Sequence, residues 1–281
     1  MLWKVARKYS LFMTTPQKIY KTEAIVLKHF AFGEADYLLT LYTPNAGRLK
    51  AVAKGARRVK SKLGGHIEPL MRTSFLITRG YNLDTINQAE VLEGHRSVRE
   101  DLDRLSIAIY MMELVDAMTP EGQSNYPIYR LLTETMRSLA DDDSQLLLSY
   151  FQLRLLGYSG FMPELYNCVE CASLLEEGHH RFAPDQGGSL CNSCHPFNVP
   201  VIPLSVDTLK VLRFLQKEEY TGRVERLHLE QGTLLELERL LETMLRHVLD
   251  REIKGSRFRN QVAHGMNWES TPTLTEIDVK G

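Results

Sequence analysis

The sequence predicts an α+β protein of several domains, in which a small N-terminal β-barrel precedes an α-helical domain with a four-cysteine insertion. Three observations lead to this fold class. Short runs rich in β-branched and aromatic residues fill residues 18–92, and apolar residues recur at helical spacing from residue 93 onward. All four cysteines of the 281-residue chain lie in two CxxC pairs, which are typical of metal-binding ribbons.

The first domain, residues 18–92, is expected to contain five short strands. They cover residues 20–28, 37–42, 49–53, 73–77 and 84–92, and Gly, Pro or Asn turns separate them. Residues 43–47, Thr-Pro-Asn-Ala-Gly, have the composition of a hairpin loop. Five strands in so short a domain favour an OB-fold, although an SH3-like barrel matches the strand count almost as well.

The second domain, residues 93–254, is expected to be α-helical. Apolar spacing predicts helices near 102–115 and 131–139, a helix over 145–157 after the acidic loop 141–144, a helix that Ser205 caps and that ends near 216, and a last helix over 233–249. Thr233 and Glu236 would form a capping box if the last helix begins there. Residues 1–17 are interpreted as an extension, with Met13 as a second candidate start, and residues 255–281 as a flexible tail.

The two cysteine pairs predict a zinc ribbon over residues 165–200. Nineteen residues separate Cys168-Val-Glu-Cys171 from Cys191-Asn-Ser-Cys194, which is within the spacing of such ribbons. Each pair offers two sulfurs from one tight turn, and Pro-Asp-Gln-Gly-Gly at 184–188 is a turn that would fold the second pair back onto the first. Four thiolates close the coordination sphere of Zn²⁺, so the ion is expected to be structural.

Other interpretations of the cysteines are weaker. Two disulfides would need an oxidising compartment, and nothing in the sequence marks the chain as secreted. Residues 191–195 match the pattern of c-type haem attachment, but that pattern leaves the first pair unexplained. A redox pair would need a βαβ context, which neither CxxC has. His179 and His180, inside the ribbon, could compete as zinc ligands.

The net charge of −1 conceals a strong asymmetry along the chain. Residues 1–80 contain 15 Lys and Arg against 4 Asp and Glu, whereas residues 81–281 contain 19 against 31. A basic module joined to an acidic one indicates that the first binds a polyanion. No apolar run has the length of a membrane span and no segment resembles a signal peptide, so we expect a cytoplasmic protein with no membrane partner.

The densest group of cations lies in residues 48–62, where no acidic residue occurs. Side chains of this kind on a strand end and its following loop can track a phosphate backbone, with salt-dependent affinity and little sequence preference. The candidate nucleic-acid contacts are therefore Arg48, Lys50, Lys54, Arg57, Arg58, Lys60 and Lys62. Five aromatic residues could stack on bases, but for each taken singly the barrel core is favoured: Tyr20, Phe30, Phe32, Tyr37 and Tyr42.

Three segments of the basic domain are distinctive: Tyr-Lys-Thr-Glu-Ala-Ile-Val-Leu-Lys at 20–28, Gly-Glu-Ala-Asp at 33–36, and Gly47 followed by Ala-Lys-Gly-Ala-Arg-Arg at 53–58 and by Ser61. These segments resemble the RecO family of bacterial recombination mediators. The resemblance covers about residues 18–250. It implies an N-terminal OB-fold, a helical domain and a zinc-binding insertion that some relatives lack.

The resemblance also implies a non-enzymatic role in recombinational repair at the bacterial nucleoid. RecO-like proteins bind single- and double-stranded DNA and anneal complementary strands. With RecR they help to load RecA onto DNA coated by single-strand-binding protein, whose acidic C-terminal tail they contact. On this chain the seven cations of residues 48–62 would contact DNA, and the tail would bind the helical domain, where the candidate rim residues are Arg130, Arg137 and Arg154.

Two functions of other classes remain open. An OB-fold with a zinc ribbon also suits an RNA-binding protein of translation or RNA processing, because phosphate contacts alone do not separate RNA from DNA. A zinc-dependent nucleic-acid enzyme would need an open metal position and would show turnover, so a fully thiolate-ligated ion without hydrolysis would exclude it. The chain has no HExxH, GxxxxGK[ST] or GxGxxG motif in a suitable context, so no catalytic residue is predicted.

Overall fold

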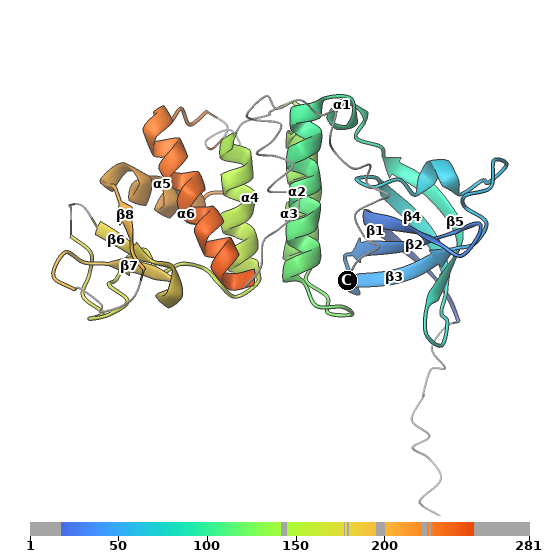
Figure 1. Cartoon of the computed structure of the whole chain (residues 1–281), viewed down its shortest axis with the longest axis horizontal. Coiled ribbons are helices and arrows are strands. Elements are labelled where there is room, and N and C mark those ends of the chain that lie inside the picture. Colours follow the sequence, from blue (N-terminus) through green and yellow to red (C-terminus); the bar gives the residue numbers. More distant parts are fainter. Residues whose placement is uncertain are drawn as a thin grey trace, which may run out of the picture.

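The computed structural model describes residues 18–141, 145–176, 178, 180–194, 200–220, 224 and 226–249. A β-barrel lies at one end of the molecule, a small β-ribbon lies at the other, and the long helices lie between them (Figure 1). The predicted extension 1–17 and tail 255–281 lie outside the described residues, as do residues 142–144 of the predicted acidic loop.

Five strands form the barrel, close to the ranges that the sequence predicts. They are β1 (Ile19–Phe32), β2 (Asp36–Thr43), β3 (Gly47–Ala53), β4 (Arg72–Thr78) and β5 (Asp84–Glu93). The barrel closes in the order β1-β2-β3-β5-β4, with β4 returning to β1 and β3 running parallel to β5. The N-terminal domain is therefore an OB-like barrel.

The long strand β1 contributes to two hydrophobic cores. Its side chains alternate between the two faces of the sheet, so Ala24 and Val26 point into the barrel, where they meet Leu39. Ile25 and Leu27 point outward and are buried in the core of the helical domain. Because one strand is shared in this way, burial of apolar surface joins the barrel to the helices.

The second domain contains the helices α1 (Arg96–Arg99), α2 (Leu102–Met118), α3 (Tyr126–Ser138), α4 (Gln145–Tyr158), α5 (Val206–Lys217) and α6 (Gln231–Leu249). Helix α4 lies between α3 on one side and α5 with α6 on the other (Figure 1). Residues Leu146–Leu153 of α4 are buried without interruption. A helix packed on all sides carries apolar residues all round, which is why α4 lacks a one-sided pattern.

The start of α5 is predicted correctly, and the capping box of α6 is not. The Ser205 side chain accepts a hydrogen bond from the Thr208 N–H at 3.2 Å, which is the expected N-cap. Helix α6 begins at Gln231 rather than at Thr233. Its Glu236 instead accepts hydrogen bonds from the Ser205 N–H at 2.7 Å and the Thr208 hydroxyl at 2.9 Å, so it ties α6 to the start of α5.

The connection between α2 and α3 lies against the β2–β3 hairpin. The Gly122 N–H donates to the Arg48 carbonyl at 2.8 Å, and the Ser124 hydroxyl donates to the Pro44 carbonyl at 3.2 Å. Gly47 has a φ of +63°, and a Cβ there would lie 1.8 Å from the Gln123 carbonyl oxygen. Only glycine permits this approach, so the hairpin and the helical domain are fixed against each other.

Candidate nucleic-acid interface and metal centre

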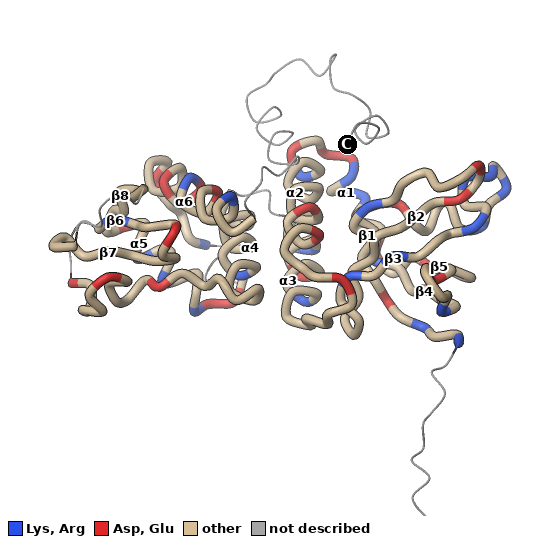
Figure 2. The backbone as a smooth tube through the Cα atoms, turned by 60° about the horizontal axis from the view of Figure 1, so that its bottom comes forward, with Lys and Arg blue, Asp and Glu red and all other residues tan. Residues whose placement is uncertain are grey.

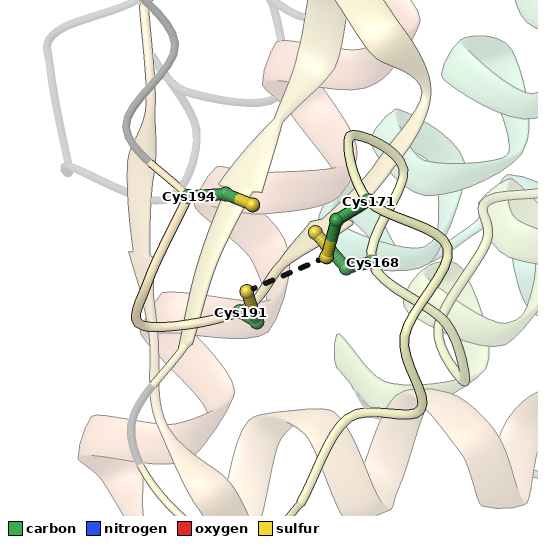
Figure 3. A group of neighbouring side chains, drawn as sticks. All are labelled: Cys168, Cys171, Cys191 and Cys194. Atoms are coloured by element: carbon green, nitrogen blue, oxygen red, sulfur yellow. Dashed lines mark hydrogen bonds between the residues drawn. The ribbon is translucent and has the colours of Figure 1, made fainter.

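The four cysteine side chains converge on one point of the ribbon (Figure 3). Their sulfur atoms all lie within 4.8 Å of one another, and the Cys171 and Cys191 sulfurs are 3.9 Å apart. A tetrahedral ion with metal–sulfur bonds of about 2.3 Å holds its sulfur ligands about 3.8 Å apart. The cluster therefore has the donor set and the dimensions of a four-thiolate metal site, and it could bind a metal ion.

The fold of the ribbon brings the two pairs together. Strand β6 (His180–Ala183) pairs with β7 (Gly188–Leu190) on one side and with β8 (Ile202–Leu204) on the other. The short 3₁₀ turn η2 (Pro184–Gln186) joins β6 to β7, so the predicted turn at 184–188 is present. The Val169 N–H donates to the Ser189 carbonyl at 3.0 Å, which docks the turn of the first pair beside the strand that leads to Cys191.

The thiols of the cluster have unequal acidity. Hydrogen bonds from the side chain and backbone of Ser173 lower the pKa of Cys171 to about 6. Hydrogen bonds with Cys171 and Cys191 raise the pKa of Cys194 to about 12. Negative charge on one sulfur thus opposes ionisation of another, and a cation at the centre would remove that opposition by attracting all the thiolates. Ser173 was missed in the sequence, where its place two residues after the first pair is the only indication.

His180 is not a member of the cluster. Its ring is buried, and its Nε2 lies 2.7 Å from the Glu176 carbonyl oxygen. The proposed competition from His180 for the metal therefore finds no support in the geometry, whereas His179 lies outside the described residues. The neighbouring Arg181 has a structural role that the sequence did not reveal, because its guanidinium donates to the Cys194 carbonyl at 2.9 Å.

Most of the candidate nucleic-acid contacts lie on the loop that follows β3. This loop is at the outer end of the barrel, away from the helices, where Lys and Arg positions gather (Figure 2). Within the part of the chain that the structure describes, no carboxylate pairs with any of the loop's five exposed cations, which are Lys54, Arg57, Arg58, Lys60 and Lys62. Their positive charge is therefore available to an external anion.

Backbone hydrogen bonds hold this basic loop in shape. The Gly55 N–H donates to an Asp36 carboxylate oxygen at 2.7 Å, and the Arg57 N–H donates to the Ala35 carbonyl at 2.9 Å. Gly55 has a φ of +67°, a left-handed conformation that glycine adopts without strain. The guanidinium of Arg57 also donates to the carbonyls of residues 33 and 34, so the loop is anchored to the β1–β2 turn.

The two remaining candidates lie apart from the basic loop: Arg48 faces α2, and Lys50 faces the connection that follows α2. Arg48 donates to a carboxylate oxygen of Asp116 at 2.7 Å, and Lys28 reaches the other oxygen at 2.9 Å. Lys50 lies 3.4 Å from Glu121. Burial opposes ionisation of Asp116, but the hydrogen bonds from Lys28 and Arg48 outweigh it and hold its pKa below the usual value.

The five aromatic residues fall into two groups. Tyr42 is fully buried, Tyr37 stacks on the ring of His29 at a centroid distance of 4.2 Å, and the Tyr20 hydroxyl donates to Asp84 at 2.6 Å. Phe30 is half-buried, and Phe32 is 44% exposed at the end of β1. The Lys28 ammonium group lies 5.2 Å from the centre of the Phe30 ring, and of the five aromatic residues Phe32 is the most exposed.

The three arginines suggested for the rim of a peptide pocket differ in their surroundings. Arg137 donates to Glu93 at 2.6 Å, and Arg154 donates to the Gln216 carbonyl at 2.6 Å. Arg130 is half exposed and lies 3.2 Å from Glu219. Arg130 differs from Arg137 in that its partner Glu219 is also exposed, at 64% against 24% for Glu93, and ion pairs exposed on both sides are weak.

An OB-like barrel with an exposed basic loop, joined to a helical domain that carries a four-cysteine ribbon, defines a two-domain protein of the OB-fold class. Family models agree with both halves. Residues 17–95 match the model described as "Recombination protein O N terminal", and residues 99–257 match "Recombination protein O C terminal". The chain belongs to the RecO family, which acts in DNA repair and recombination.

Curated relatives match over nearly their whole length. The DNA repair protein RecO of Desulforamulus reducens is 36% identical over 87% of this chain and 95% of its own. Those of a Roseiflexus species and of Desulforudis audaxviator are each 37% identical, over 92% and 86% of this chain and 90% and 96% of their own. None of these relatives is described as an RNA-binding protein, so nothing here points to the RNA alternative. None of the helices among the described residues is long and apolar enough to cross a membrane.

Proposed function

We propose that this protein is a non-enzymatic recombination mediator. It binds single- and double-stranded DNA, anneals complementary strands and, together with RecR, helps to load RecA onto DNA coated by single-strand-binding protein. Membership of the RecO family supports the class of function. The observation that carries DNA binding is the basic loop after β3, with five exposed cations that pair with no carboxylate among the described residues.

The proposed DNA contacts are the cations of the basic loop, which can neutralise successive phosphates. Lys50 can join them, because its ion pair with Glu121 is exposed on both sides and such pairs contribute less than about 1 kcal/mol. Arg48 has a different role in this proposal, since Asp116 already holds its guanidinium in a mostly buried pair. DNA binding of this kind depends on salt and reads little sequence.

The metal of the ribbon is proposed to be a structural Zn²⁺. Cysteine thiolates suit zinc, and the four sulfurs within 4.8 Å leave no position for a water or a substrate. When bound, the ion would clamp the turn of the first pair to the end of β7, on the side of the helical domain far from the barrel (Figure 1). This arrangement supports a stabilising metal and a protein that is not an enzyme.

The partner surface for the acidic tail of single-strand-binding protein is proposed to lie on the helical domain. Arg130 is the preferred rim residue, because its pairs with Glu134 and Glu219 are exposed and a peptide carboxylate can replace them at small energetic cost. The proposed location is the cytoplasm, on nucleoid DNA.

A charge reversal tests the DNA-binding loop. The double variant Arg57→Glu with Arg58→Glu should weaken binding of a fluorescein-labelled single strand at least tenfold at about 50 mM salt and reduce the salt slope, because two phosphate contacts are lost. The matched control is Lys210→Glu with Arg239→Glu, which makes the same charge change at exposed positions of α5 and α6. Equal affinity and slope for the loop variant and the wild-type protein would refute this site.

A further inference from the structure

The outer face of β1, β2 and β3 carries a row of apolar side chains next to the basic loop. Leu39 and Ala51 point into the barrel, so their neighbours along the strands point outward. Phe30 pairs with Leu38, and Leu38 pairs with Val52, which places these three side chains side by side on the outer face. Phe30 and Leu38 are partly exposed on this face, whereas Val52 beside them is only 6% exposed, so the apolar surface that meets solvent lies on β1 and β2.

Phe32 extends this surface toward the basic loop. It lies two residues beyond Phe30 on β1, on the same face, and pairs with Asp36 at the start of β2. Its side chain is 44% exposed. The carboxylate of Asp36 accepts the Gly55 N–H at 2.7 Å, which links this end of the face directly to the basic loop.

Cations lie at both ends of the two phenylalanines. At one end the Lys28 ammonium group is 5.2 Å from the centre of the Phe30 ring and also pairs with Asp116. The same cross-strand row contains Lys50, whose pair with Glu121 is exposed. At the other end Arg57 donates to the carbonyls of the turn that follows Phe32. An aromatic surface between two groups of cations suits a polyanion whose bases expose flat apolar faces. Single-stranded nucleic acid has this chemistry.

The spacing of the rings suits unpaired bases. Residues two apart on a strand are about 6.7 Å apart, which is twice the rise of about 3.4 Å per nucleotide in a stacked strand. Each ring can therefore accept its own base when the strand is stretched. In a duplex the base faces are covered by neighbouring pairs, so such a surface offers a duplex nothing beyond phosphate contacts.

We infer that Phe30 and Phe32 form a base-stacking surface on the outer face of β1, which makes the barrel prefer single-stranded to double-stranded DNA. This inference rests on the proposed DNA-binding function and adds to it the residues that select the form of DNA. The basic loop supplies affinity for both forms, and the phenylalanines supply the difference between them.

Substitution of Phe32 tests the inference, because its exposure makes the folded state tolerant of the change. Phe32→Ala should weaken binding of a short single strand about tenfold and change binding of a duplex of the same length less than twofold. The salt slope should stay unchanged, because no phosphate contact is lost. The Phe32→Ala variant should quench the fluorescence of a 2-aminopurine base in the strand less than the wild-type protein does. Phe32→Tyr should restore affinity, and Phe32→Leu should not.

The matched control is Phe161→Ala, which removes a ring of similar exposure, 49%, from the helical domain. It should leave both affinities unchanged. If Phe32→Ala weakens both forms of DNA equally or neither, or if Phe32→Leu restores affinity, the stacking surface is refuted. Failure of the DNA-binding site itself would show differently, as unchanged affinity in the variant with Arg57 and Arg58 reversed.

Discussion

The sharpest prediction concerns two arginines, Arg48 and Arg57, that are close in sequence but have opposite roles. Arg48 is tied to Asp116 across the domain junction, whereas Arg57 is exposed on the basic loop. Arg48→Ala should therefore lower stability and leave DNA binding nearly unchanged. Arg57→Ala should do the reverse. The two substitutions are chemically identical, so each serves as the control for the other.

The magnitude for Arg48 follows from its contacts. Its guanidinium donates to the carboxylate and to the backbone carbonyl of Asp116, and the two side chains are only 22% and 21% exposed. A hydrogen bond to a charged group contributes about 1.5–3 kcal/mol, and Asp116 keeps Lys28 as a partner after the change. We expect a loss of about 2 kcal/mol, which lowers the melting temperature by about 4–8 °C in a chain of this size.

Two measurements check this prediction. Thermal melting followed by circular dichroism gives the stability, and fluorescence anisotropy at several salt concentrations gives the affinity and the number of phosphate contacts. Arg57→Ala should reduce the salt slope on a single strand by about 0.7, the share of one phosphate. If Arg48→Ala reduced the slope by the same amount while the melting temperature stayed constant, the pair with Asp116 would not persist in solution and the assignment of roles would be wrong.

Three further predictions concern the metal, the junction and a turn. Chelation of the metal or Cys191→Ser should lower stability by about 3 kcal/mol or more and leave DNA affinity intact, as measured by melting and anisotropy; lost DNA binding at unchanged stability would contradict a structural role. Because the pKa of Asp116 is lowered in the folded protein, its contribution is complete above the ordinary carboxyl pKa near 4 and is lost as the pH falls toward the lowered value, so Asp116→Asn should flatten the fall in melting temperature on the acid side. Gly47→Ala should destabilise by more than about 2 kcal/mol in denaturant titration, since its Cβ would collide with the Gln123 carbonyl, whereas Gly33→Ala, with a similar φ and open space, should cost about 1 kcal/mol; equal losses would mean that the hairpin does not press on the helical domain.

The barrel was predictable because its signals are local. Alternating β-branched residues and Gly or Pro turns predict strands one at a time, and all five strands lie where these patterns place them. The β1 strand runs on to Phe32, beyond the predicted end at Lys28, because pairing with β2 continues through an irregularity after Val26. Strand order was not predictable in the same way, since pairing partners depend on contacts far apart in the chain.

In the helical domain, too, features that depend on neighbouring residues were predictable, and features that depend on tertiary contacts were not. The cap at Ser205 depends on a side chain and a backbone N–H three residues away, so the sequence predicts it. The capping box, which required α6 to begin at Thr233, is absent because the helix begins at Gln231, and Glu236 instead bonds to the start of α5, thirty-one residues earlier. Helix α4 is buried on all sides and has no one-sided apolar pattern. The sequence still predicts it, because a long segment rich in leucine is typical of a helix.

The sequence by itself determined the four cysteines as one cluster, the basic loop and the resemblance to the RecO family, because motif spacing and charge density are properties of short segments. Only the tertiary structure decided which cations are available to DNA, since Asp116 and Glu121, on and beside α2, pair with Arg48 and Lys50 across about seventy residues of chain. It likewise decided which aromatic rings face solvent, because the register of β1 against β2 turns Phe30 and Phe32 outward. Ion pairing and exposure are properties of neighbours in space, and the chain order does not contain them.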